Sequence, residues 1–307
     1  MKLPVFKAFF ATFSYVVVHF LTLVKILWLP MLGVMAVTAY LTPAMIDAQL
    51  SMAAAEGMND DAMVLGTMGQ VLKTTGMLYL AMAIFYPMMI AGVLRHVVRG
   101  DAPGLPFYLS YGADEFRILG AFILYIVMLM LAYFVGALGL IVIGVVASML
   151  SQAIGGILIG VLAIAFVIAL VWFMLRMSLI FPASIGERKI GIAHSWAVTK
   201  GSAWSLFFFW FLIFIVVFAF IAVYIGVAAS DYFPIFQEML ASANDPAAIE
   251  ELEQRMMQMQ RDMWDMSRPG FWVYIAASYL FSIVYNAICN VASGIAYRYL
   301  TGDQRSA

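Results

Sequence analysis

The 307-residue chain has little charge and almost no cysteine. Charged residues make up 11% of it, whereas a soluble domain carries about a quarter, so an ordinary soluble fold is excluded. Its one cysteine, Cys289, excludes an internal disulfide and a CxxC metal site. The net charge of −1 gives no electrostatic argument for nucleic-acid binding, and we expect none.

Long apolar runs dominate instead, because 65% of the residues are hydrophobic. Runs of about 20 residues suit a helix that crosses ~30 Å of hydrocarbon, where the backbone must satisfy its own hydrogen bonds. The runs lack the period-two alternation of barrel strands. We therefore predict an all-α bundle of six transmembrane helices, as one domain over residues 1–307. The predicted spans are about 24–42, 74–94, 118–146, 157–180, 204–230 and 271–297.

Two long loops, 43–73 and 231–270, are predicted on the non-cytoplasmic side. In the second loop, Asn244 and Asp245 can cap a helix that begins at Pro246. Apolar residues then follow at heptad spacing for less than three heptads: Ile249, Leu252, Met256, Met259, Met263 and Met266. We expect this helical cap to pack on loop 43–73 or on the membrane surface. Residues 3–23 are expected to form an interfacial helix or an oblique start to the first span.

The distribution of basic residues predicts the orientation. Twelve Lys and Arg residues would lie on one side and four on the other, the four being Lys73, Arg255, Arg261 and Arg268. Since basic residues favour the cytoplasmic side, both termini are predicted to be cytoplasmic, in a bacterial-type inner (plasma) membrane.

Methionine is abundant, with 23 residues, and Met256, Met257 and Met259 cluster in the second loop. Thioethers are ligands for Cu(I), so copper binding is one interpretation. The heptad seam already explains Met256 and Met259 as packing residues, and neither loop contains His or Cys. We therefore predict packing residues, with no metal site and no cofactor.

The segment from Arg176 to Trp204 lies between two apolar runs and combines charged, Pro, Gly and aromatic residues. Arg176 follows an uncharged run, and a charge inside the hydrocarbon needs a partner. Three interpretations are open: a side chain that extends to the interface, a structural clamp with Glu187, or a substrate contact. The clamp would need a fold-back over Pro182–Gly186.

The same segment carries a family resemblance. Arg176-Met-Ser-Leu-Ile-Phe-Pro182, Glu187, Ser195-Trp196-Ala-Val-Thr199-Lys-Gly201 and Trp204 occur in that order, and Tyr297-Arg298-Tyr299-Leu300 ends the last span. From Val161 to Asp303 the chain resembles the glycerophosphoryl diester phosphodiesterase membrane-domain family. The resemblance implies a stand-alone membrane domain. It implies no phosphodiesterase activity, because the enzyme's A-H-R-G stretch is absent.

Two other regions carry polar residues. In the last span, a polar ladder recurs every four residues on one helix face: Tyr274, Ser278, Ser282, Asn286, Asn290 and Gly294. It would either join helices by hydrogen bonds or line a polar cavity, with Asn286 and Asn290 as the best candidates. Residues 95–117 are predicted to form a solvated cytoplasmic loop near anionic lipids.

No nucleophile–base pair or metal-ligand cluster is evident, so we predict a protein that is not an enzyme. The expected role is scaffolding or support of membrane processes. The alternative is a transporter or lipid-handling protein with a polar path near Arg176, Asn286 and Asn290. Membrane lipids are the expected partners, with a protein partner or a second copy of the chain as the further alternatives.

Overall fold

The computed structural model describes residues 2–58, 61–101, 111–150, 152–228, 233–242 and 245–302, and all regular elements among them are helices. The predicted all-α class is confirmed. Six helices are long and apolar enough to cross a membrane, so this is a multi-pass membrane protein. The candidate spans are Phe20–Met52, Val64–Arg99, Ala113–Met149, Gly155–Glu187, Ala203–Gly226 and Gly270–Thr301.

The chain divides into two compact units. Unit 1 comprises Met1–Leu23, Ile90–Ile213 and Ile288–Ala307, and unit 2 comprises Val24–Met89 and Phe214–Ala287. Four helices contribute residues to both units: α2 (Phe20–Met58), α3 (Asp61–Leu94), α8 (Ala203–Ala228) and α11 (Pro269–Thr301). A single transmembrane domain over residues 1–307 stays a prediction.

Unit 1 contains the segment from Arg176 to Trp204, which we name the signature segment, and the elements that hold it. Its own elements are α1 (Val5–Val18), the π-helix η1 (Arg95–Arg99), α4 (Ala113–Leu150), α5 (Gln152–Met177), α6 (Ile180–Glu187) and α7 (Ile192–Val198). A buried apolar cluster joins α3, α4 and α6 through Ala91, Leu94, Ile118 and Ile185. Burial of these side chains fixes α6 against the start of α4, which positions the segment that follows α5.

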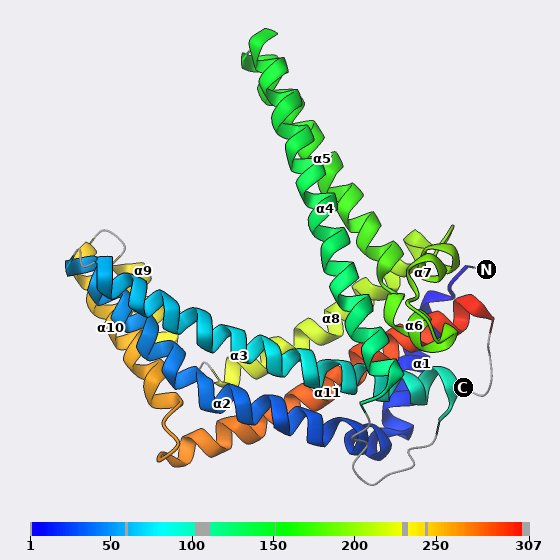
Figure 1. Cartoon of the computed structure of the whole chain (residues 1–307), viewed down its shortest axis with the longest axis horizontal. Coiled ribbons are helices and arrows are strands. Elements are labelled where there is room, and N and C mark those ends of the chain that lie inside the picture. The colour runs from blue at the N-terminus through cyan, green and yellow to red at the C-terminus, as the bar shows by residue number, and fades with distance from the viewer. Residues whose placement is uncertain are drawn as a thin grey trace. The chain divides into compact units, whose positions relative to one another are not determined.

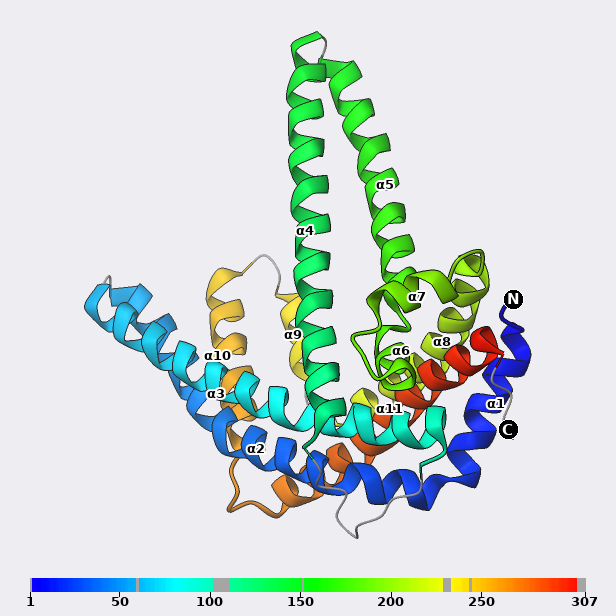
Figure 2. The same cartoon turned by 45° about the vertical axis from the view of Figure 1, so that its right-hand side comes forward.

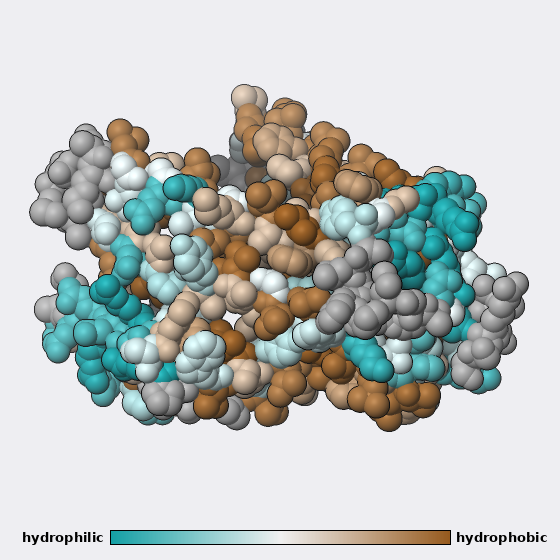
Figure 3. Space-filling view, turned by 60° about the horizontal axis from the view of Figure 1, so that its bottom comes forward, coloured by the Kyte–Doolittle hydropathy of each residue, from teal (hydrophilic) through white to brown (hydrophobic). Residues whose placement is uncertain are grey.

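Helices α4 and α5 form an antiparallel hairpin (Figures 1 and 2). No residue in the most apolar 18-residue stretch of either helix is buried within the protein. Phe134 and Ile164, for example, are 71% and 65% exposed. Apolar residues, brown in Figure 3, also cover much of the visible face. Such surfaces suit contact with lipid rather than with water.

Unit 2 corrects the first predicted loop. Residues 43–73 are largely helical, because α2 continues to Met58 and α3 begins at Asp61. Ala, Met and Leu make up nearly half of this stretch, and these residues favour helix even where mean hydropathy falls. A hydropathy criterion therefore predicts the end of α2 too early and the start of α3 too late.

The second predicted loop contains two helices, α9 (Phe233–Ala241) and α10 (Pro246–Met263). The predicted start at Pro246 is confirmed, and Asp245 accepts a hydrogen bond from the Ala248 N–H at 3.3 Å. Asn244 lies outside the described residues. Helix α10 reaches α2 of the same unit through an ion pair of 3.2 Å between Arg261 and Asp47. The seam is shorter than predicted, because Met266 lies in a turn beyond the helix end.

Candidate functional site

The chain reverses direction after α5 by means of two short helices. Pro182 is buried in the first turn of α6, where its missing N–H breaks no helical bond. Arg188 then ends α6 in a left-handed conformation with φ of 54°. The Gly191 N–H donates to Ser184 Oγ at 2.9 Å, which brings α7 back onto α6. The chain therefore reverses at residues 188–191, a few residues after the predicted fold-back at Pro182–Gly186.

Ser195 and Thr199 lie one helical turn apart on α7, and both are fully buried. Their hydroxyls donate to the Arg176 carbonyl oxygen at 2.9 Å and 3.2 Å. The last carbonyls of a helix have no partner within the helix, so these two side chains satisfy the end of α5. Gly201 follows with φ of +78°, a conformation that favours glycine, before α8 begins.

The Arg176 side chain is only 5% exposed, and it packs against aromatic rings. Its guanidinium carbon lies 4.5 Å from the centre of the Trp196 ring and 5.6 Å from that of Trp172. Such cation–π contacts contribute about 0.5–2 kcal/mol each but leave the charge unneutralised. Among the described residues, no carboxylate pairs with Arg176, and its buried Nε has no hydrogen-bond partner.

The predicted clamp between Arg176 and Glu187 is wrong. Glu187 instead lies 3.5 Å from Lys189 Nζ and 3.6 Å from His194 Nε2. The reversal at Arg188 directs Glu187 toward α7 and away from the end of α5. The side chain of Arg176 does not extend into solvent either. For Arg176, extension to the membrane interface and contact with a substrate both stay predictions.

An apolar groove of about 610 Å³ opens beside Arg176. Its lining comes from the second half of α5 and from the region where α8 begins. The residues are Val167, Ile168, Val171, Trp172 and Leu175 of α5, Gly201 before α8, and Ala203, Trp204 and Phe207 of α8. Arg176 is the single charged residue among the described residues of this lining. Trp204 is 76% exposed at its edge. The groove thus combines an apolar trough with one buried, unpaired cation.

The polar ladder of α11 is divided between different roles. Ser278 bonds the Tyr224 hydroxyl of α8 at 2.6 Å, which fits the interpretation that the ladder joins helices. The Asn286 amide donates to the Ser282 carbonyl within its own helix at 2.9 Å. The Asn290 carbonyl accepts from the Ser293 hydroxyl at 2.9 Å. Neither Asn286 nor Asn290 lines the apolar groove beside Arg176 or the polar cavity around His19, His96 and His194.

The three candidate copper ligands lie on α10 and are half-buried. Their partial burial suits packing, and nothing in the geometry tests copper binding. Among the described residues, no group of three His, Cys, Asp or Glu side chains is arranged to hold a metal ion. The expected absence of a metal site stays a prediction.

In the range 95–117, the described residues 95–101 and 111–117 are not the solvated loop that the sequence predicts. Glu115 is fully buried and accepts from Arg95 at 2.6 Å and from the Gly112 N–H at 2.8 Å. Asp114 binds both terminal nitrogens of Arg99, at 2.8 Å and 3.1 Å, and also contacts Arg117. We name these five charged residues the ionic cluster. It ties η1 to α4, and residues 102–110 lie outside the described residues.

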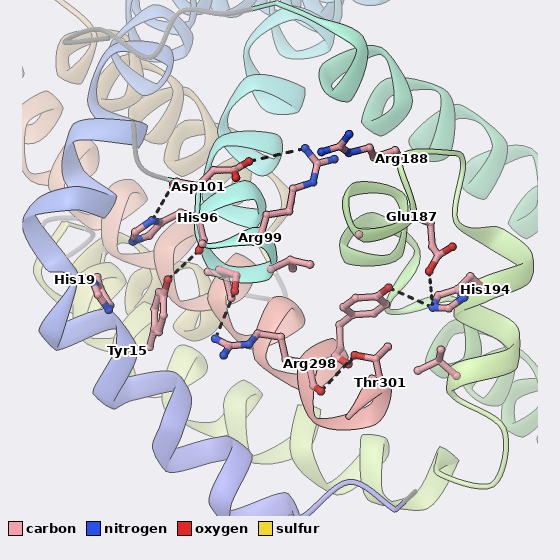
Figure 4. Close-up of a pocket in the computed structure, with 16 residues that line it drawn as sticks. Tyr15, His19, His96, Arg99, Asp101, Glu187, Arg188, His194, Arg298 and Thr301 are labelled. Carbon is pink, nitrogen blue, oxygen red and sulfur yellow. Dashed lines mark hydrogen bonds and ion pairs between the residues drawn. The ribbon is translucent and has the colours of Figure 1, made fainter. Parts of the chain in front are cut away.

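A second, polar cavity of about 980 Å³ lies in unit 1, with its walls on α1, η1, α6, α7 and α11 (Figure 4). His19, His96 and His194 line it, and these are all the histidines of the chain. The Tyr15 hydroxyl donates to the His96 carbonyl at 3.2 Å. Burial raises the pKa of the Tyr15 phenol, and the charge of Arg298 opposes this rise to a smaller extent. Sequence reasoning missed this cavity.

Comparisons with protein-family models, curated proteins and solved structures find no match to this chain. The resemblance to the glycerophosphoryl diester phosphodiesterase membrane-domain family therefore stays a prediction. What the geometry adds is a physical role for its residues, since Ser195, Trp196 and Thr199 all contact Arg176.

Proposed function

We propose that this protein is a non-enzymatic, lipid-handling membrane protein that holds an anionic phospholipid in the groove beside Arg176. The observation that carries this proposal is a buried arginine, 5% exposed, that lines an apolar groove and has no counter-charge among the described residues. A charge near the hydrocarbon is costly without a partner. A lipid phosphate can supply that partner while its acyl chain lies along α5.

The cationic and the apolar parts of the groove together suit one amphiphilic molecule, with an anionic headgroup and an acyl chain. Guanidinium groups bind phosphate through paired, charge-assisted hydrogen bonds. Trp172 and Trp196 pack against the guanidinium, and the side chain is buried, so little side-chain freedom remains to be lost on binding. Val167, Ile168 and Val171 give the acyl chain an apolar wall. Tryptophan at the edge of the groove, as Trp204 is, also favours the headgroup region of a bilayer.

We expect the Arg176→Gln variant to lose the bound lipid. Lipid would be extracted from purified protein and quantified by mass spectrometry, relative to the composition of the source membrane. The wild type is expected to retain anionic phospholipid in excess over the membrane average, and Arg176→Gln to retain about ten-fold less. Arg255→Gln removes an exposed arginine of α10 that pairs with Glu238, and it is expected to retain the wild-type amount.

A second variant separates lost binding from lost folding. Val171→Trp fills the groove but keeps Arg176, so it should reduce retained lipid while its unfolding curve stays cooperative. Equal lipid retention by the wild type, Arg176→Gln and Val171→Trp at equal folded fractions would contradict the proposal.

The scaffolding role has one observation in its favour, the unburied apolar hairpin of α4 and α5. A protein partner or a second copy of the chain could cover this surface in place of lipid. Scaffolding is therefore retained as the second candidate function, and retention of a stoichiometric protein partner after purification in place of lipid would favour it.

We further propose the predicted location, a bacterial-type inner membrane with both termini in the cytoplasm. The basic residues of η1, of the turn after α6 (Arg188 and Lys189) and of the end of α11 support it, because they gather in unit 1. Reporter fusions after Pro246 and after Arg305 are expected to lie on opposite sides of the membrane. A shared side would show that the number of crossings differs from six.

A further inference from the structure

We infer that the polar cavity of unit 1 is a second binding site, and that its ligand carries a phosphate group. This inference is independent of the Arg176 groove, since no residue lines both cavities. Segments far apart in the sequence form its walls: His19 follows α1, His96 lies on η1, and His194 lies on α7. Figure 4 shows His19 and His96 on one side and His194 with Glu187 on the other.

The cations of the cavity favour an anion. Three arginines line it: Arg99, Arg188 and Arg298. Arg99 is a fixed part of the wall, because Asp114 and the Ile185 carbonyl oxygen hold its guanidinium. Arg298 donates to the Val97 carbonyl through a long bond of 3.5 Å. Arg188 is exposed, and no described residue pairs with it.

The acids of the lining do not cancel this charge. Asp101 lies 3.9 Å from Arg99 and offsets the one excess positive charge of the ionic cluster, in which three arginines face only Asp114 and Glu115. Glu187 is shared between Lys189, at 3.5 Å, and His194, at 3.6 Å. Arg188 therefore remains as an exposed cation of the lining without a counter-charge among the described residues. Paired donors on a guanidinium match phosphate oxygens in geometry as well as charge.

The imidazoles add groups that suit a phosphate ester. The Asp101 carbonyl oxygen lies 3.3 Å from His96 Nδ1, and since a carbonyl only accepts, that nitrogen carries the proton. His96 Nε2 is buried and has no hydrogen-bond partner among the described residues. His194 Nε2 contacts the Tyr297 hydroxyl at 3.2 Å. A neutral ring accepts from a P–OH or ligand hydroxyl, and a protonated ring donates to phosphate oxygen.

The volume of the cavity indicates an organic phosphate rather than the bare ion. A space of about 980 Å³ is far larger than one phosphate group and lies at the upper end of small-molecule sites. The lining is polar on several sides, so the organic part should also be polar, as in a glycerol phosphate. Such a group occurs both in soluble phosphomonoesters and in the headgroups of phospholipids.

The test uses the full chain in nanodiscs of phosphatidylcholine and two probes. Radiolabelled glycerol 3-phosphate represents the soluble source, and nanodiscs that contain phosphatidic acid represent the lipid source. Saturable binding of glycerol 3-phosphate is expected if the ligand is soluble. If the ligand is a headgroup, phosphatidic acid should instead raise the unfolding midpoint of the protein in proportion to its content. Either result supports a phosphate site.

Arg188→Gln identifies the site. Because Arg188 is exposed and unpaired among the described residues, this variant should fold normally, yet its affinity for the effective probe should fall about ten-fold. The control variant Arg255→Gln removes an exposed arginine of unit 2, and it should bind the probe with the affinity of the wild type. The inference is overturned if neither probe has an effect, or if Arg188→Gln responds as strongly as the wild type.

Discussion

Glu115→Ala is expected to lower the free energy of unfolding by about 3 kcal/mol, one of the two largest single losses that we anticipate in this chain. Glu115 is fully buried and accepts from Arg95 at 2.6 Å. Its other oxygen accepts from the Gly112 N–H, so it also caps the start of α4 in the manner of a capping box. Alanine leaves a half-buried guanidinium and a helix-terminal N–H without this partner.

Denaturant titration of detergent-solubilised protein measures this loss. Glu238→Ala is the matched control, because Glu238 and Arg255 form an exposed pair at 3.3 Å. Exposed pairs contribute little, so the control should change stability by less than about 0.5 kcal/mol. Similar losses in the two variants would show that the ionic cluster behaves as a solvated loop, as the sequence predicted.

Gly191→Ala is expected to cost about 3 kcal/mol through overpacking at the turn between α6 and α7. A β-carbon at Gly191 would lie 2.6 Å from the Ser184 backbone nitrogen and 2.7 Å from the Ala183 carbonyl carbon. Backbone atoms cannot rotate away as a flexible side chain can. The turn must therefore open, and Ser195 and Thr199 would lose their hydrogen bonds to the Arg176 carbonyl oxygen.

Gly139→Ala in α4 is the control for this substitution. No atom lies within 4 Å of the β-carbon position at Gly139, so alanine should be neutral or stabilise the helix by about 0.5–1 kcal/mol. Unfolding midpoints of both variants and lipid retention by Gly191→Ala provide the measurement. A Gly191→Ala protein with wild-type stability would mean that α7 does not pack closely on α6.

The six spans could be predicted because long apolar runs have a single solution in a membrane, the helix. Their ends could not. Residues 43–73 contain enough polar side chains to fall below a hydropathy threshold, yet α2 and α3 extend through most of them. Helix ends depend on local propensity and tertiary packing, whereas mean hydropathy reports only the stretch that suits hydrocarbon.

The composition of the sequence identified the signature segment, but it did not predict which side chains of the segment pair. Arg176 and Glu187 seemed natural partners, because no other acid lies nearer in the sequence. The left-handed Arg188 turns the chain so that Glu187 meets His194 instead. Two tryptophans, which the sequence offers on either side, pack around the cation. Proline and glycine indicated a fold-back in this region, but they did not fix the residue at which the chain reverses, and that residue decides which side chains meet.

The polar cavity of unit 1 and the ionic cluster were missed for a related reason. Their members come from segments that tertiary folding brings together, so no local spacing connects them. One signal was present: the chain has only three histidines, of which His19 interrupts an apolar run and His96 follows one. That signal does not predict contact between the rings.

The proposal of a lipid site at Arg176 is tested most directly by photo-crosslinking in nanodiscs. The probe is a phosphatidylglycerol with a diazirine on its acyl chain, and a phosphatidylcholine with the same acyl chain serves as control. Labelling by the anionic probe should be saturable and should map to residues 167–175 and 203–207. It should weaken about ten-fold in Arg176→Gln. The proposal would be contradicted if both probes label the protein equally, if the label is spread over the exposed surface of α4, and if Arg176→Gln leaves the labelling unchanged.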